Sequence, residues 1–473
     1  MEINGAKMFV KALQEEGVDT LFAYPGGTAI DLFDALYDAE GIDMILPRHE
    51  QALVHAADGY ARSTGRVGVC LVTSGPGATN LVTGIATANY DSVPLVCFTG
   101  QVPLNLIGND AFQEVDIVGI TRSICKYAVT VRKREDLARI IKNAFYIART
   151  GKPGPVVVDI PKDIQLAMGS DEYPSEVNIR GYKPSEGVHV GQIKRALAEL
   201  KNAKKPVFLC GGGVNIAHAR KEMQQLAEKT GIPVVTTIMG KGAIPTDHPL
   251  YVGNIGMHGN LASNKAIMES DVLFSIGCRF NDRITGTIDT FAKNAKIIHV
   301  DIDAASISRN IKVDIPIVAD AKVAISKMLE YAEPLDIKGW VDDIMNVKAE
   351  YPINMNRYDG VTPEAIIRTI NDMYSNLIVT TDVGQNQLWT TQYIDIDENK
   401  QLLTSGGLGT MGYGFPAAIG AKIGNMDKDV ICISGDGGVQ MNIQEMATAV
   451  ALELPVTLCI LNNGYLGNVR QWQ

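Results

Sequence analysis

Two apolar runs near the end of the sequence are each followed by oxygen-bearing side chains. Residues 429–434 precede Gly435-Asp436-Gly437-Gly438, and residues 455–461 precede Asn462-Asn463-Gly464-Tyr465. Both runs are bounded by turn residues, as is typical of buried strands in a parallel sheet, and the intervening residues 444–452 are typical of a helix. We therefore predict one β-α-β unit, with a tight turn at the Asp-Gly pair and oxygen ligands at the tips of both strands.

A carboxylate, a side-chain amide and a nearby backbone carbonyl suit a hard cation such as Mg²⁺, which keeps water and phosphate oxygens as its other ligands. The glycines let the backbone approach a diphosphate closely. The alternative is that an Asp-Gly turn and an Asn turn, both common in α/β proteins, merely recur here. In this order and at this spacing, however, the pair resembles the signature of thiamine-diphosphate (ThDP) enzymes.

Glu50 is the second candidate for chemistry. It lies in His49-Glu50-Gln51, after the strand-like residues 43–46 and before a predicted helix that runs through Tyr60. A Glu at this place could simply be a helix N-terminal acid that the helix dipole favours. ThDP must also be activated by a carboxylate that hydrogen-bonds its aminopyrimidine N1′ from a second domain. The His-Glu-Gln segment, followed by Gly59-Tyr60-Ala61-Arg62, resembles that part of ThDP enzymes.

The composition is that of an ordinary α/β enzyme with an ample core. The chain has 473 residues, of which 46% are hydrophobic and 20% charged, with 46 glycines, and this length predicts about two to four domains. The formal charge of −10 and the lack of a long Lys/Arg cluster argue against nucleic acid as a partner. No apolar run approaches a membrane span, and the N-terminus lacks a signal-peptide core. We therefore expect a cytoplasmic protein with no membrane partner.

The cysteines and histidines offer no metal site. The seven cysteines are scattered, mostly in apolar strands, without a Cys-x-x-Cys pair, and the seven histidines have no ligand spacing. We expect small, reduced thiols and neither a disulfide framework nor a metal site built on cysteine.

Alternating helix and strand patterns predict three α/β domains, each a doubly wound parallel sheet. The expected order is a ThDP pyrimidine-binding-like domain over 1–165, a polar linker over 163–187, a central domain over 188–333, a connector with a short helix over 334–360, and a diphosphate-binding-like domain over 362–473. The third block is much shorter than the first, and its sheet stops just after its second ligand-bearing strand. We therefore expect the third domain to be incomplete at its C-terminus.

The pattern also predicts individual elements. A helix is expected over 5–16, and buried strands are expected over 20–23, 67–73, 94–99 and 155–159 in the first block, over 206–210, 233–236, 272–276 and 296–301 in the second, and over 377–381 in the third.

Longer motifs spread over the whole chain narrow the resemblance. They are Phe22-Ala23-Tyr24-Pro25-Gly26-Gly27, Arg48-His49-Glu50-Gln51, Thr73-Ser74-Gly75-Pro76-Gly77-Ala78-Thr79-Asn80, Gly100-Gln101-Val102-Pro103, Ile107-Gly108-Asn109-Asp110-Ala111-Phe112-Gln113-Glu114, Gly407-Leu408-Gly409-Thr410-Met411-Gly412-Tyr413-Gly414 and Val469-Arg470-Gln471-Trp472-Gln473. Together they resemble the acetolactate synthase (acetohydroxyacid synthase) family of ThDP-dependent carboligases. ThDP enzymes broadly share the metal signature, whereas the Ala-Phe-Gln-Glu and Arg-Gln-Trp-Gln segments are typical of a much narrower group of enzymes.

The resemblance implies roles around ThDP. Asp436 and Asn463 would ligate Mg²⁺ by their side chains and Tyr465 by its carbonyl, and Glu50 would activate the cofactor. Met411 matches the apolar residue that holds ThDP in its bent form, although a Met there could also be a core residue. The other implied cofactor contacts are Tyr24, Pro25, Val383, Gly384, Gln385, Gly409, Gly435, Gly437 and Gly438.

Further roles concern the reacting carbon and the second substrate. The resemblance places Gly26, Phe112, Gln113 and Lys162 around the reacting carbon, and Trp472 at the pocket for the second 2-ketoacid. Taken alone, Phe112 is as well explained by a core aromatic, Lys162 by a solvated lysine and Trp472 by a packing residue.

The middle block resembles the FAD site of the same family. Its candidate residues lie at or beyond predicted strand ends, where nucleotides bind in open sheets: Gly211, Gly212, Gly213, Gly256, Met257, His258, Gly277, Arg279, Arg283, Asp301 and Ile302. Three adjacent glycines could also be a bare tight turn, and the two arginines could pair with Asp282 on the surface. Within the resemblance, Arg279 and Arg283 contact the diphosphate and flank the active-site channel, and Arg279 is also assigned to the substrate.

The resemblance implies acetolactate synthase activity. Pyruvate would be decarboxylated on ThDP, and the hydroxyethyl unit transferred to a second pyruvate, giving 2-acetolactate, or to 2-ketobutyrate, giving 2-aceto-2-hydroxybutyrate, the first common step of branched-chain amino acid biosynthesis. It also implies ThDP, Mg²⁺ and a largely structural FAD, a homodimer or homotetramer with the active site across two chains, and a small regulatory subunit as a partner.

Two alternatives stay open. One is a sibling ThDP-flavin enzyme such as pyruvate oxidase, against which Arg470-Gln471-Trp472-Gln473 argues. The other is a non-catalytic, cofactor-binding homologue that acts in assembly or regulation, against which the intact Glu50, Asp436 and Asn463 argue.

Overall fold

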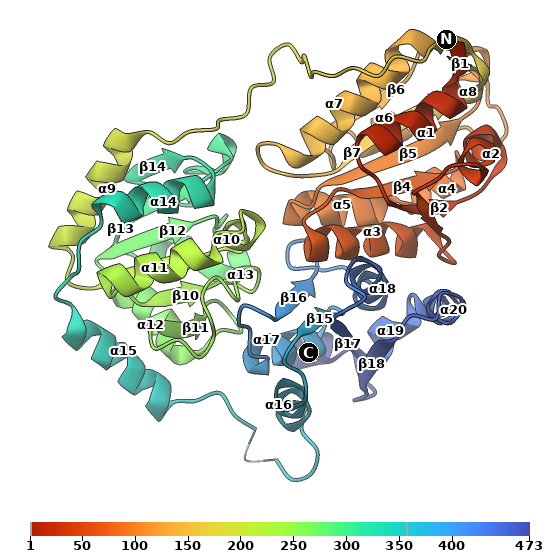
Figure 1. The fold of residues 1–473 in the computed structure, drawn as a ribbon. Helices are drawn as coiled ribbons and strands as arrows, with labels where there is room; N and C mark the ends of the chain where they lie inside the picture. The colour runs from red at the N-terminus through yellow and green to blue at the C-terminus, as the bar shows by residue number, and fades with distance from the viewer. Residues whose placement is uncertain (1, 356–357) are drawn as a thin grey trace. The chain divides into compact units, whose positions relative to one another are not determined.

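The chain folds into two compact units that together contain three large sheets. The computed structural model describes residues 2–355 and 358–473, so positions 356 and 357 of the predicted connector lie outside the described residues. The first unit comprises Met1–Lys183, Ile378–Gly384 and Leu403–Gln473, and the second comprises Pro184–Leu377 and Gln385–Leu402. Two sheets have six strands and the third has four, which confirms the predicted class of three α/β sheets (Figure 1).

The first sheet has the strand order β3-β2-β4-β5-β7-β6, with every neighbouring pair parallel. Alternate residues of its strands feed two buried clusters: Leu21 and Ala23 belong to one and Phe22 to the other, as the period of two in a strand requires. The strands are β2 (Thr20–Tyr24), β3 (Asp43–Ile45), β4 (Gly68–Val72), β5 (Leu95–Gln101), β6 (Tyr127–Thr130) and β7 (Val156–Pro161). The four strands predicted for this block are confirmed, and β6 was not predicted.

Helices cover the two faces of this sheet. The predicted first helix is confirmed as α1 (Gly5–Glu15), whose N-terminus is capped by Asn4: the Asn4 side chain accepts a hydrogen bond of 2.9 Å from the Lys7 N–H, a common N-cap arrangement. The other helices of eight or more residues are α2 (Ile30–Tyr37), α3 (Glu50–Thr64), α5 (Val82–Asp91) and α7 (Leu137–Arg149).

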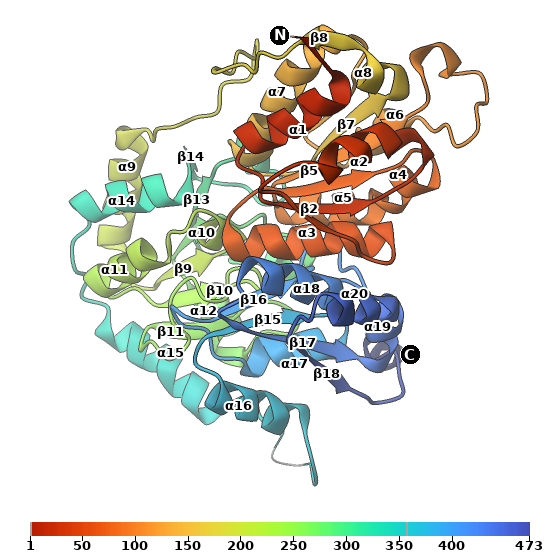
Figure 2. The same ribbon diagram turned by 45° about the vertical axis from the view of Figure 1, so that its right-hand side comes forward.

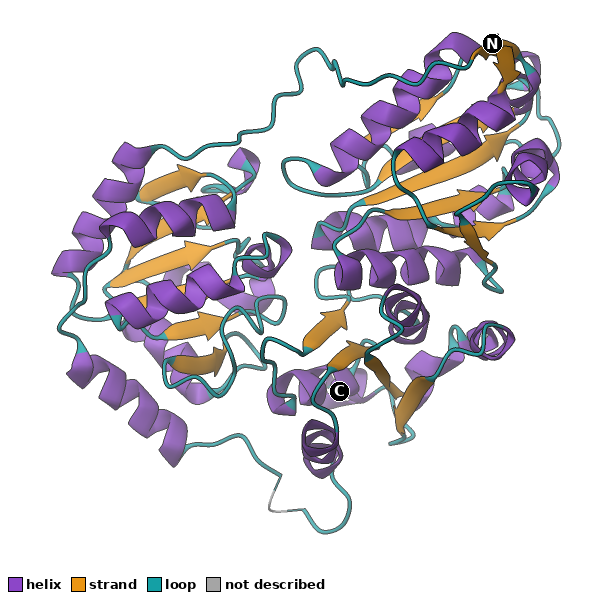
Figure 3. Cartoon of the chain, in the orientation of Figure 1, coloured by secondary structure: helices purple, strands orange, loops and turns teal. Residues whose placement is uncertain are grey.

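The irregular linker predicted over 163–187 is wrong in its first part. Helix α8 (Lys162–Leu166) and strand β8 (Met168–Ser170) occupy this stretch, and β8 pairs antiparallel with β1 (Glu2–Asn4). The pattern missed these strands because a short surface ladder takes its stability from backbone hydrogen bonds and needs no apolar run. Only the stretch between β8 and α9 (Val190–Asn202) is loop (Figure 3).

The middle sheet lies in the second unit and is parallel throughout, in the order β11-β10-β9-β12-β13-β14. Its first strand in the chain lies inside the sheet, with later strands added on both sides. The strands are β9 (Pro206–Cys210), β10 (Val234–Thr236), β11 (Tyr251–Asn254), β12 (Val272–Ile276), β13 (Lys296–Asp301) and β14 (Ile315–Val318). The four predicted strands are confirmed, whereas β11 and β14, with only four residues each, were missed.

The helix predicted in the connector is part of the second unit's core. It is α15 (Lys338–Glu350), whose Trp340 and Ile344 are buried in the same apolar cluster as the middle sheet. The Trp340 indole N–H donates to the Pro206 carbonyl at 3.1 Å. The other helices of this unit are α9, α10 (Gly212–Ile216), α11 (Arg220–Thr230), α12 (Leu261–Glu269), α13 (Asp282–Thr285), α14 (Ala321–Tyr331), α16 (Pro363–Met373) and α17 (Gln385–Tyr393).

The third sheet has the order β16-β15-β17-β18. Its strands are β15 (Leu377–Thr381), β16 (Gln401–Thr404), β17 (Asp429–Gly435) and β18 (Val456–Leu461), and the helices that follow β16 are α18 (Gly414–Gly424), α19 (Asp436–Gln440), α20 (Met446–Ala451) and α21 (Gly467–Trp472). The predicted β-α-β unit is confirmed. Its predicted tight turn is wrong, because Gly435 caps a helix with an extended backbone (φ −81°, ψ 162°) and α19 begins directly at Asp436.

Helices α3 and α18 lie side by side in both views (Figures 1 and 2) and join the first and third sheets within the first unit. Their approach depends on small residues. A Cβ at Gly59 would overlap the Ala417 carbonyl, and a Cβ at Gly420 would overlap the Ala56 carbonyl. Because the blocking atoms are backbone, neither helix can yield without moving as a whole.

Replacing Gly420 by Ala should therefore destabilise the first unit. We expect Gly420→Ala to lower the free energy of unfolding by roughly 1–3 kcal/mol, the usual cost of overpacking, measured by urea denaturation. The matched control is Gly339→Ala on α15, where an added Cβ meets no atom within 4 Å and a helical alanine should cost nothing. Equal effects of the two substitutions would contradict the close approach.

Candidate functional site

The first candidate site lies where the chain reverses direction in the first sheet. From β2 the chain moves outward to β3 and then returns to β4 on the other side of β2, so the carboxyl ends of β2 and β4 form a topological switch point, the usual ligand position in such sheets. Tyr24, Pro25 and Gly26 follow β2 there. A Cβ at Gly26 would lie 2.5 Å from the Cβ of Thr73, the residue after β4, so only glycine fits.

Glu50 faces this switch point. It is the first residue of α3, and its neighbour His49 caps the helix by accepting a hydrogen bond at Nδ1 from the Gln51 N–H (3.1 Å). Glu50 Oε2 accepts from the Asn80 amide at 2.9 Å, and a Cβ at Gly77 would lie 3.4 Å from Glu50 Oε1. The carboxylate is thus held against the 73–80 loop that follows β4.

Other predicted residues gather at the same edge. Lys162 follows β7, and its Nζ lies 3.4 Å from the Gly27 carbonyl and 3.8 Å from the Asp31 carboxylate. Gln113 has a positive φ of 59°, and a Cβ at Gly75 would lie 2.8 Å from its carbonyl. Lys162, Gln113 and the residues around Gly26 are therefore brought to one edge of the sheet, whereas the Phe112 side chain is 86% exposed and packs little on the described residues.

The second candidate site lies at the switch point of the third sheet, where β15 adjoins both β16 and β17. Asp436 follows β17, and the register pairs Gly435 with Leu461, so the residues after both strands leave the sheet at the same edge. Asn463 Oδ1 accepts from the Tyr465 N–H at 3.0 Å, which folds this segment back on itself. The arrangement brings the Asp436 and Asn463 segments together.

Trp472 does not pack against the Asp436 and Asn463 segments. It ends α21, a helix with no buried residue, and its side chain is 70% exposed. The ring of Tyr465, the other aromatic of this segment, instead lies 3.8 Å from the guanidinium carbon of Arg470.

Met411 reaches the Asp436 segment. A Cβ at Gly437 would lie 3.9 Å from Met411 Cε and 3.2 Å from Leu466 Cδ2. Two residues earlier, a Cβ at Gly409 would lie 4.0 Å from Val383 Cγ1. The predicted residues Met411, Gly409, Gly437 and Val383, the latter followed by Gly384, thus line one edge of the third sheet. Gln385 is the first residue of α17 and belongs to the second unit.

Asp382 is a residue that sequence reasoning missed. It follows β15, and its buried carboxylate accepts from the N–H groups of Val383 (2.9 Å), Gly412 (3.0 Å) and Gly414 (3.0 Å). Burial raises the pKa of Asp382, against these three donors, which lower it. The Gly412 peptide is held at its other end too, because the Asn442 amide donates to the Gly412 carbonyl at 2.7 Å. A carboxylate directly after a buried strand at a switch point was the signal that could have identified it.

The ligand atoms at the two edges fit ThDP and a hard cation. The described residues contain no group of three His, Cys, Asp or Glu side chains suited to a metal. The candidate donors are one carboxylate, one amide and one carbonyl, all oxygen ligands, which suits Mg²⁺ when phosphate supplies further oxygens. At the first edge, the buried Ser74 Oγ has no hydrogen-bond partner among the described residues, as expected of a group that faces a polar ligand.

In the second unit, the predicted glycines pack on one another. A Cβ at Gly211 would overlap the Gly277 carbonyl, and a Cβ at Gly213 would lie 2.6 Å from the Gly277 Cα. A Cβ at Gly212 would meet the Met239 Cβ at 3.0 Å. These glycines follow β9 and β12, the two strands at the switch point of the middle sheet. Their first use is therefore the close approach of two strand ends, at the place where a nucleotide would bind.

The remaining FAD candidates surround this switch point. The Met257 N–H donates to the Arg283 carbonyl at 3.1 Å, and a Cβ at Gly256 would overlap the same carbonyl. The Arg283 side chain is exposed and lies 3.6 Å from Asp282, so the surface ion pair is present. Burial, followed by the Arg283 charge, lowers the pKa of His258.

Polar groups at this edge fit a nucleotide. Arg279 lies on the loop after β12, and the buried Asn281 Oδ1 has no hydrogen-bond partner within the described chain. Asp301 ends β13 and accepts from the Asp303 N–H at 2.9 Å, with Ile302 between them. A cation, an unpaired acceptor and a carboxylate around a switch point are the groups that a phosphate-bearing nucleotide needs.

The cysteine prediction is confirmed as far as disulfides are concerned, because all seven thiols are free. Among the described residues, no helix is both long enough and apolar enough to pass through a membrane.

His55 is a buried base on α3 that the candidate chemistry does not use. Its ring is fully buried, neither ring nitrogen has a hydrogen-bond partner among the described residues, and the ring packs edge-on against Tyr413 with centroids 5.4 Å apart. Burial, followed by the charge of Arg62, lowers the pKa of His55 to about 3. The imidazole is therefore neutral in the folded protein.

His55 should make the first unit acid-sensitive. Its pKa is lower in the folded than in the unfolded chain, so its contribution is complete above about pH 6.5 and is lost as the pH falls toward about 3. Between about pH 7.5 and about pH 5.5, wild type should lose about 1.4 kcal/mol more unfolding free energy than His55→Leu. Urea denaturation at both pH values measures this. The other histidines are common to both proteins and cancel, so parallel pH dependences would contradict the prediction.

Comparison with known proteins covers the whole chain. Three family models match: "Thiamine pyrophosphate enzyme, N-terminal TPP binding domain" over residues 3–120, "Thiamine pyrophosphate enzyme, central domain" over 193–328, and "Thiamine pyrophosphate enzyme, C-terminal TPP binding domain" over 382–473. The central match contains the whole middle sheet, whereas the other two matches contain the first and third sheets only in part. Glu50, Asp436 and Asn463 fall within the matched regions, and Lys162 lies outside them.

Individual relatives are similar along the full sequence. A probable acetolactate synthase large subunit of Methanococcus aeolicus is 49% identical over 494 residues, covering 100% of this chain and 82% of the relative. The acetolactate synthase large subunit of Haemophilus influenzae and the acetolactate synthase isozyme 3 large subunit of Escherichia coli are each 46% identical, covering 100% of this chain and 84% of each relative.

Proposed function

The chain belongs to the acetolactate synthase large subunits, a family of thiamine pyrophosphate-dependent enzymes, and on this premise we propose how its residues make 2-acetolactate and CO₂ from two molecules of pyruvate. One observation carries the assignment of residues. The Glu50 carboxylate is held at the switch-point edge of the first sheet, and the Asp436 and Asn463 segments leave the same edge of the third sheet, and these three residues lie within the two matched cofactor-binding spans.

Each of these residues has a defined task toward the cofactor. When bound, ThDP supplies the electron sink for loss of CO₂ from a 2-ketoacid. Glu50 would hold the aminopyrimidine of ThDP by a hydrogen bond from its carboxylate, and would thereby supply the group that activates the cofactor. The hydrogen bond from Asn80 at 2.9 Å fixes one oxygen of Glu50 and leaves the other for the cofactor. Asp436, Asn463 and the Tyr465 carbonyl would hold Mg²⁺, which would neutralise the charge of the diphosphate.

The residues around the first sheet's edge act on the first pyruvate. Lys162 carries the positive charge there, held by Asp31 at 3.8 Å, and attracts the substrate carboxylate. Gln113 and Gly26 shape the space beside the reacting carbon, and Phe112 becomes covered only when substrate binds. Trp472 and Arg279 select the second 2-ketoacid. The reaction exchanges no electrons with an external acceptor, so FAD at the middle sheet is structural.

Assembly and substrate range complete the proposal. The enzyme also accepts 2-ketobutyrate as the second substrate and works as a homodimer or homotetramer, with a small regulatory subunit as partner. The relatives are named large subunits, which supports a smaller partner in those proteins. The test is sedimentation and activity with and without that subunit.

The activity is tested by incubating the purified protein with pyruvate and with or without ThDP, Mg²⁺ and FAD. Acetolactate that requires ThDP and Mg²⁺ but consumes no oxygen supports the proposal. Peroxide, or acetoin formed directly in place of acetolactate, would favour the oxidase alternative. Binding of ThDP without release of CO₂ would favour the non-catalytic alternative.

Glu50→Gln should separate activation from binding. An amide at this position cannot promote proton removal, so kcat should fall by about 10²–10⁴, the usual contribution of a positioned acid or base, while the Kd for ThDP changes far less. The matched control is Glu333→Gln, an exposed glutamate paired with Lys201 at 2.8 Å, whose kcat should equal that of wild type.

Asp436→Ala tests the other half of the site. Loss of the only carboxylate in the proposed metal set should abolish Mg²⁺-dependent ThDP binding, measured by calorimetry. If Asp436→Ala bound ThDP and Mg²⁺ as tightly as wild type, the proposed metal set would be wrong, even if Glu50→Gln behaved as expected.

A further inference from the structure

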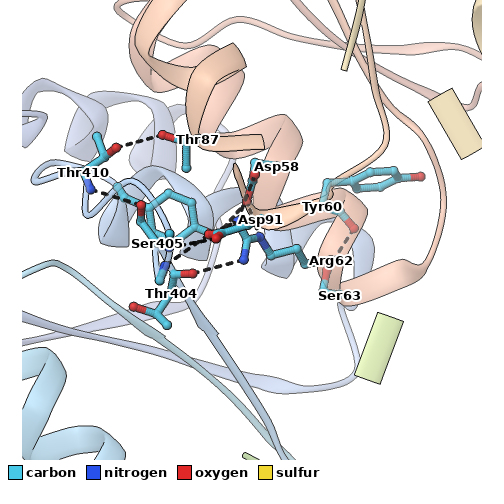
Figure 4. Close-up of polar contacts among 12 residues, drawn as sticks. Asp58, Tyr60, Arg62, Ser63, Thr87, Asp91, Thr404, Ser405 and Thr410 are labelled. Carbon is cyan, nitrogen blue, oxygen red and sulfur yellow. Dashed lines mark hydrogen bonds and ion pairs between the residues drawn. The ribbon is translucent and has the colours of Figure 1, made fainter. Parts of the chain in front are cut away.

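A buried ionic network connects α3 and α5 with the segment that leads to Met411 (Figure 4). Its centre is Arg62 on α3, which donates from Nε to Asp58 at 2.6 Å and from Nη2 to Asp91 at 3.0 Å. Arg62 also donates from Nη1 to the Thr404 carbonyl at 3.0 Å. The Tyr413 hydroxyl donates to Asp58 at 2.7 Å. One guanidinium thus joins two carboxylates and the end of β16.

Asp91 is the member of the network that contacts the backbone of the loop. Its Oδ1 accepts from the Gly407 N–H at 2.8 Å, and its Oδ2 accepts from the Gly406 N–H at 3.1 Å. These two amides follow β16 and precede Met411 within the Gly407–Gly414 motif. A single carboxylate therefore fixes two consecutive peptide groups of a segment to which the resemblance assigns cofactor contacts.

The network is costly to bury, and its charges do not cancel. Asp58 and Asp91 are both buried, and within the described part of the chain a single guanidinium, that of Arg62, pairs with both of them. Burial alone would lower the pKa of Arg62, but the two carboxylates and Tyr413 raise it well above its usual value. The remaining negative charge is stabilised by the two loop amides and the Tyr413 hydroxyl. Apolar side chains would hold α3 against α18 at less cost, so stability alone does not explain this arrangement.

The same segment is held at further points on both sides of Met411. The Thr410 and Thr87 hydroxyls lie 2.8 Å apart, and the Thr410 N–H donates to Ser405 Oγ at 3.0 Å. On the other side of Met411, Asp382 accepts from the Gly412 N–H at 3.0 Å. The backbone before and after Met411 is thus set by Thr87 and Asp382 outside the loop and by Ser405 at its start, which leaves the Met411 side chain to meet Gly437.

We propose that Asp91 is a positioning residue for the cofactor: by holding the Gly406 and Gly407 amides, it fixes the turn that presents Met411 to ThDP. This inference rests on the proposed function of Met411 as the apolar support of ThDP. Asp91 touches neither cofactor nor substrate and acts through the loop. Arg62 and Glu50 lie on the same helix, α3. The network therefore also fixes the position of the Met411 turn relative to the helix that carries Glu50, the proposed activating carboxylate.

The test is Asp91→Asn in the whole purified protein. An amide at position 91 keeps one acceptor oxygen but turns a donor toward the second loop N–H, so one of the two hydrogen bonds is lost while Arg62 keeps Asp58. Without ThDP, hydrogen exchange should be at least about tenfold faster than in wild type at whichever of the Gly406 and Gly407 amides loses its acceptor. The Kd for ThDP should rise about tenfold, which equals about 1.4 kcal/mol.

Catalytic constants distinguish positioning from general damage. Once ThDP and Mg²⁺ saturate the variant, the bound cofactor orders the turn, so kcat should recover to within about threefold of wild type, with KM for pyruvate unchanged. The matched control is Asp136→Asn, which removes the charge of an exposed carboxylate 2.7 Å from Arg139 and should change none of these quantities. An unchanged Kd for ThDP in Asp91→Asn, or unchanged exchange at both amides, would overturn the proposal.

A second variant covers the case in which Asp91→Asn does not fold. Thr87→Val removes one hydroxyl of the Thr87–Thr410 pair without altering charge or volume, and should weaken ThDP binding by about threefold in the same direction, again with KM for pyruvate unchanged. An unaltered ThDP affinity in this variant would count against the proposal.

A failure of the proposed function can be told apart from a failure of the Asp91 proposal. If wild type made no acetolactate, the family reaction would be rejected, while the exchange rates of the two amides would still decide whether Asp91 holds the turn.

Discussion

Parallel pairing of strands is the constraint on which the structure depends. In a parallel sheet all strand ends of one kind meet at one edge, and where the chain reverses its direction of growth the connections leave that edge uncovered. The first, middle and third sheets each begin with an internal strand, β2, β9 and β15 respectively. Apart from the exposed Trp472 helix, the segments that the sequence marks for chemistry follow the strands that end at these edges or lie against the loops that do. The three sheets therefore offer the same kind of position to three different chemical groups.

A second constraint ties two of these edges together. Helices α3 and α18 approach until glycine is the only residue that fits at Gly59 and Gly420. Such close contact leaves no room for side chains to adjust, so polar groups at its margin are held in fixed geometry. The Asp58-Arg62-Asp91 network occupies that margin (Figure 4). Rigid packing of small residues and a costly buried charge thus serve one arrangement, in which Glu50 and the turn before Met411 are both fixed relative to helix α3.

The sequence predicted those features that depend on local pattern. Strand burial and turn formation depend on the types of consecutive residues. The sequence therefore predicts the apolar strands, the residues Asp436 and Asn463 at the strand ends, and the helix that starts at Glu50. Asp91 could not be recognised in this way. It accepts from the backbone amides of Gly406 and Gly407, far away in the chain, and a backbone group carries no sequence signal.

Other features that the sequence did not predict also depend on contacts between distant parts of the chain. The β1–β8 ladder is stabilised by main-chain hydrogen bonds between the two ends of the first block, and α15 looks like a connector until Trp340 is seen to fill the core of the middle sheet. The predicted glycines of the middle sheet were assigned to a ligand, whereas their first use is to let β9 and β12 end against each other. Composition marks a position as special, but only the fold shows whether a ligand or the chain itself requires it.

The close packing of α3 on α18 has a consequence for biosynthesis. Asp58 and its partner Tyr413 are 355 residues apart, which at a usual rate of roughly 5–20 residues per second corresponds to roughly 20–70 s of translation. During this time the N-terminal sheet can fold, but the small-residue face of α3, with its aspartate and arginine, has no helix to cover it. The first unit is therefore completed only after the second has been made, and the nascent chain exposes this face throughout that interval. A chain of this design depends on its folding environment more than its final stability would indicate.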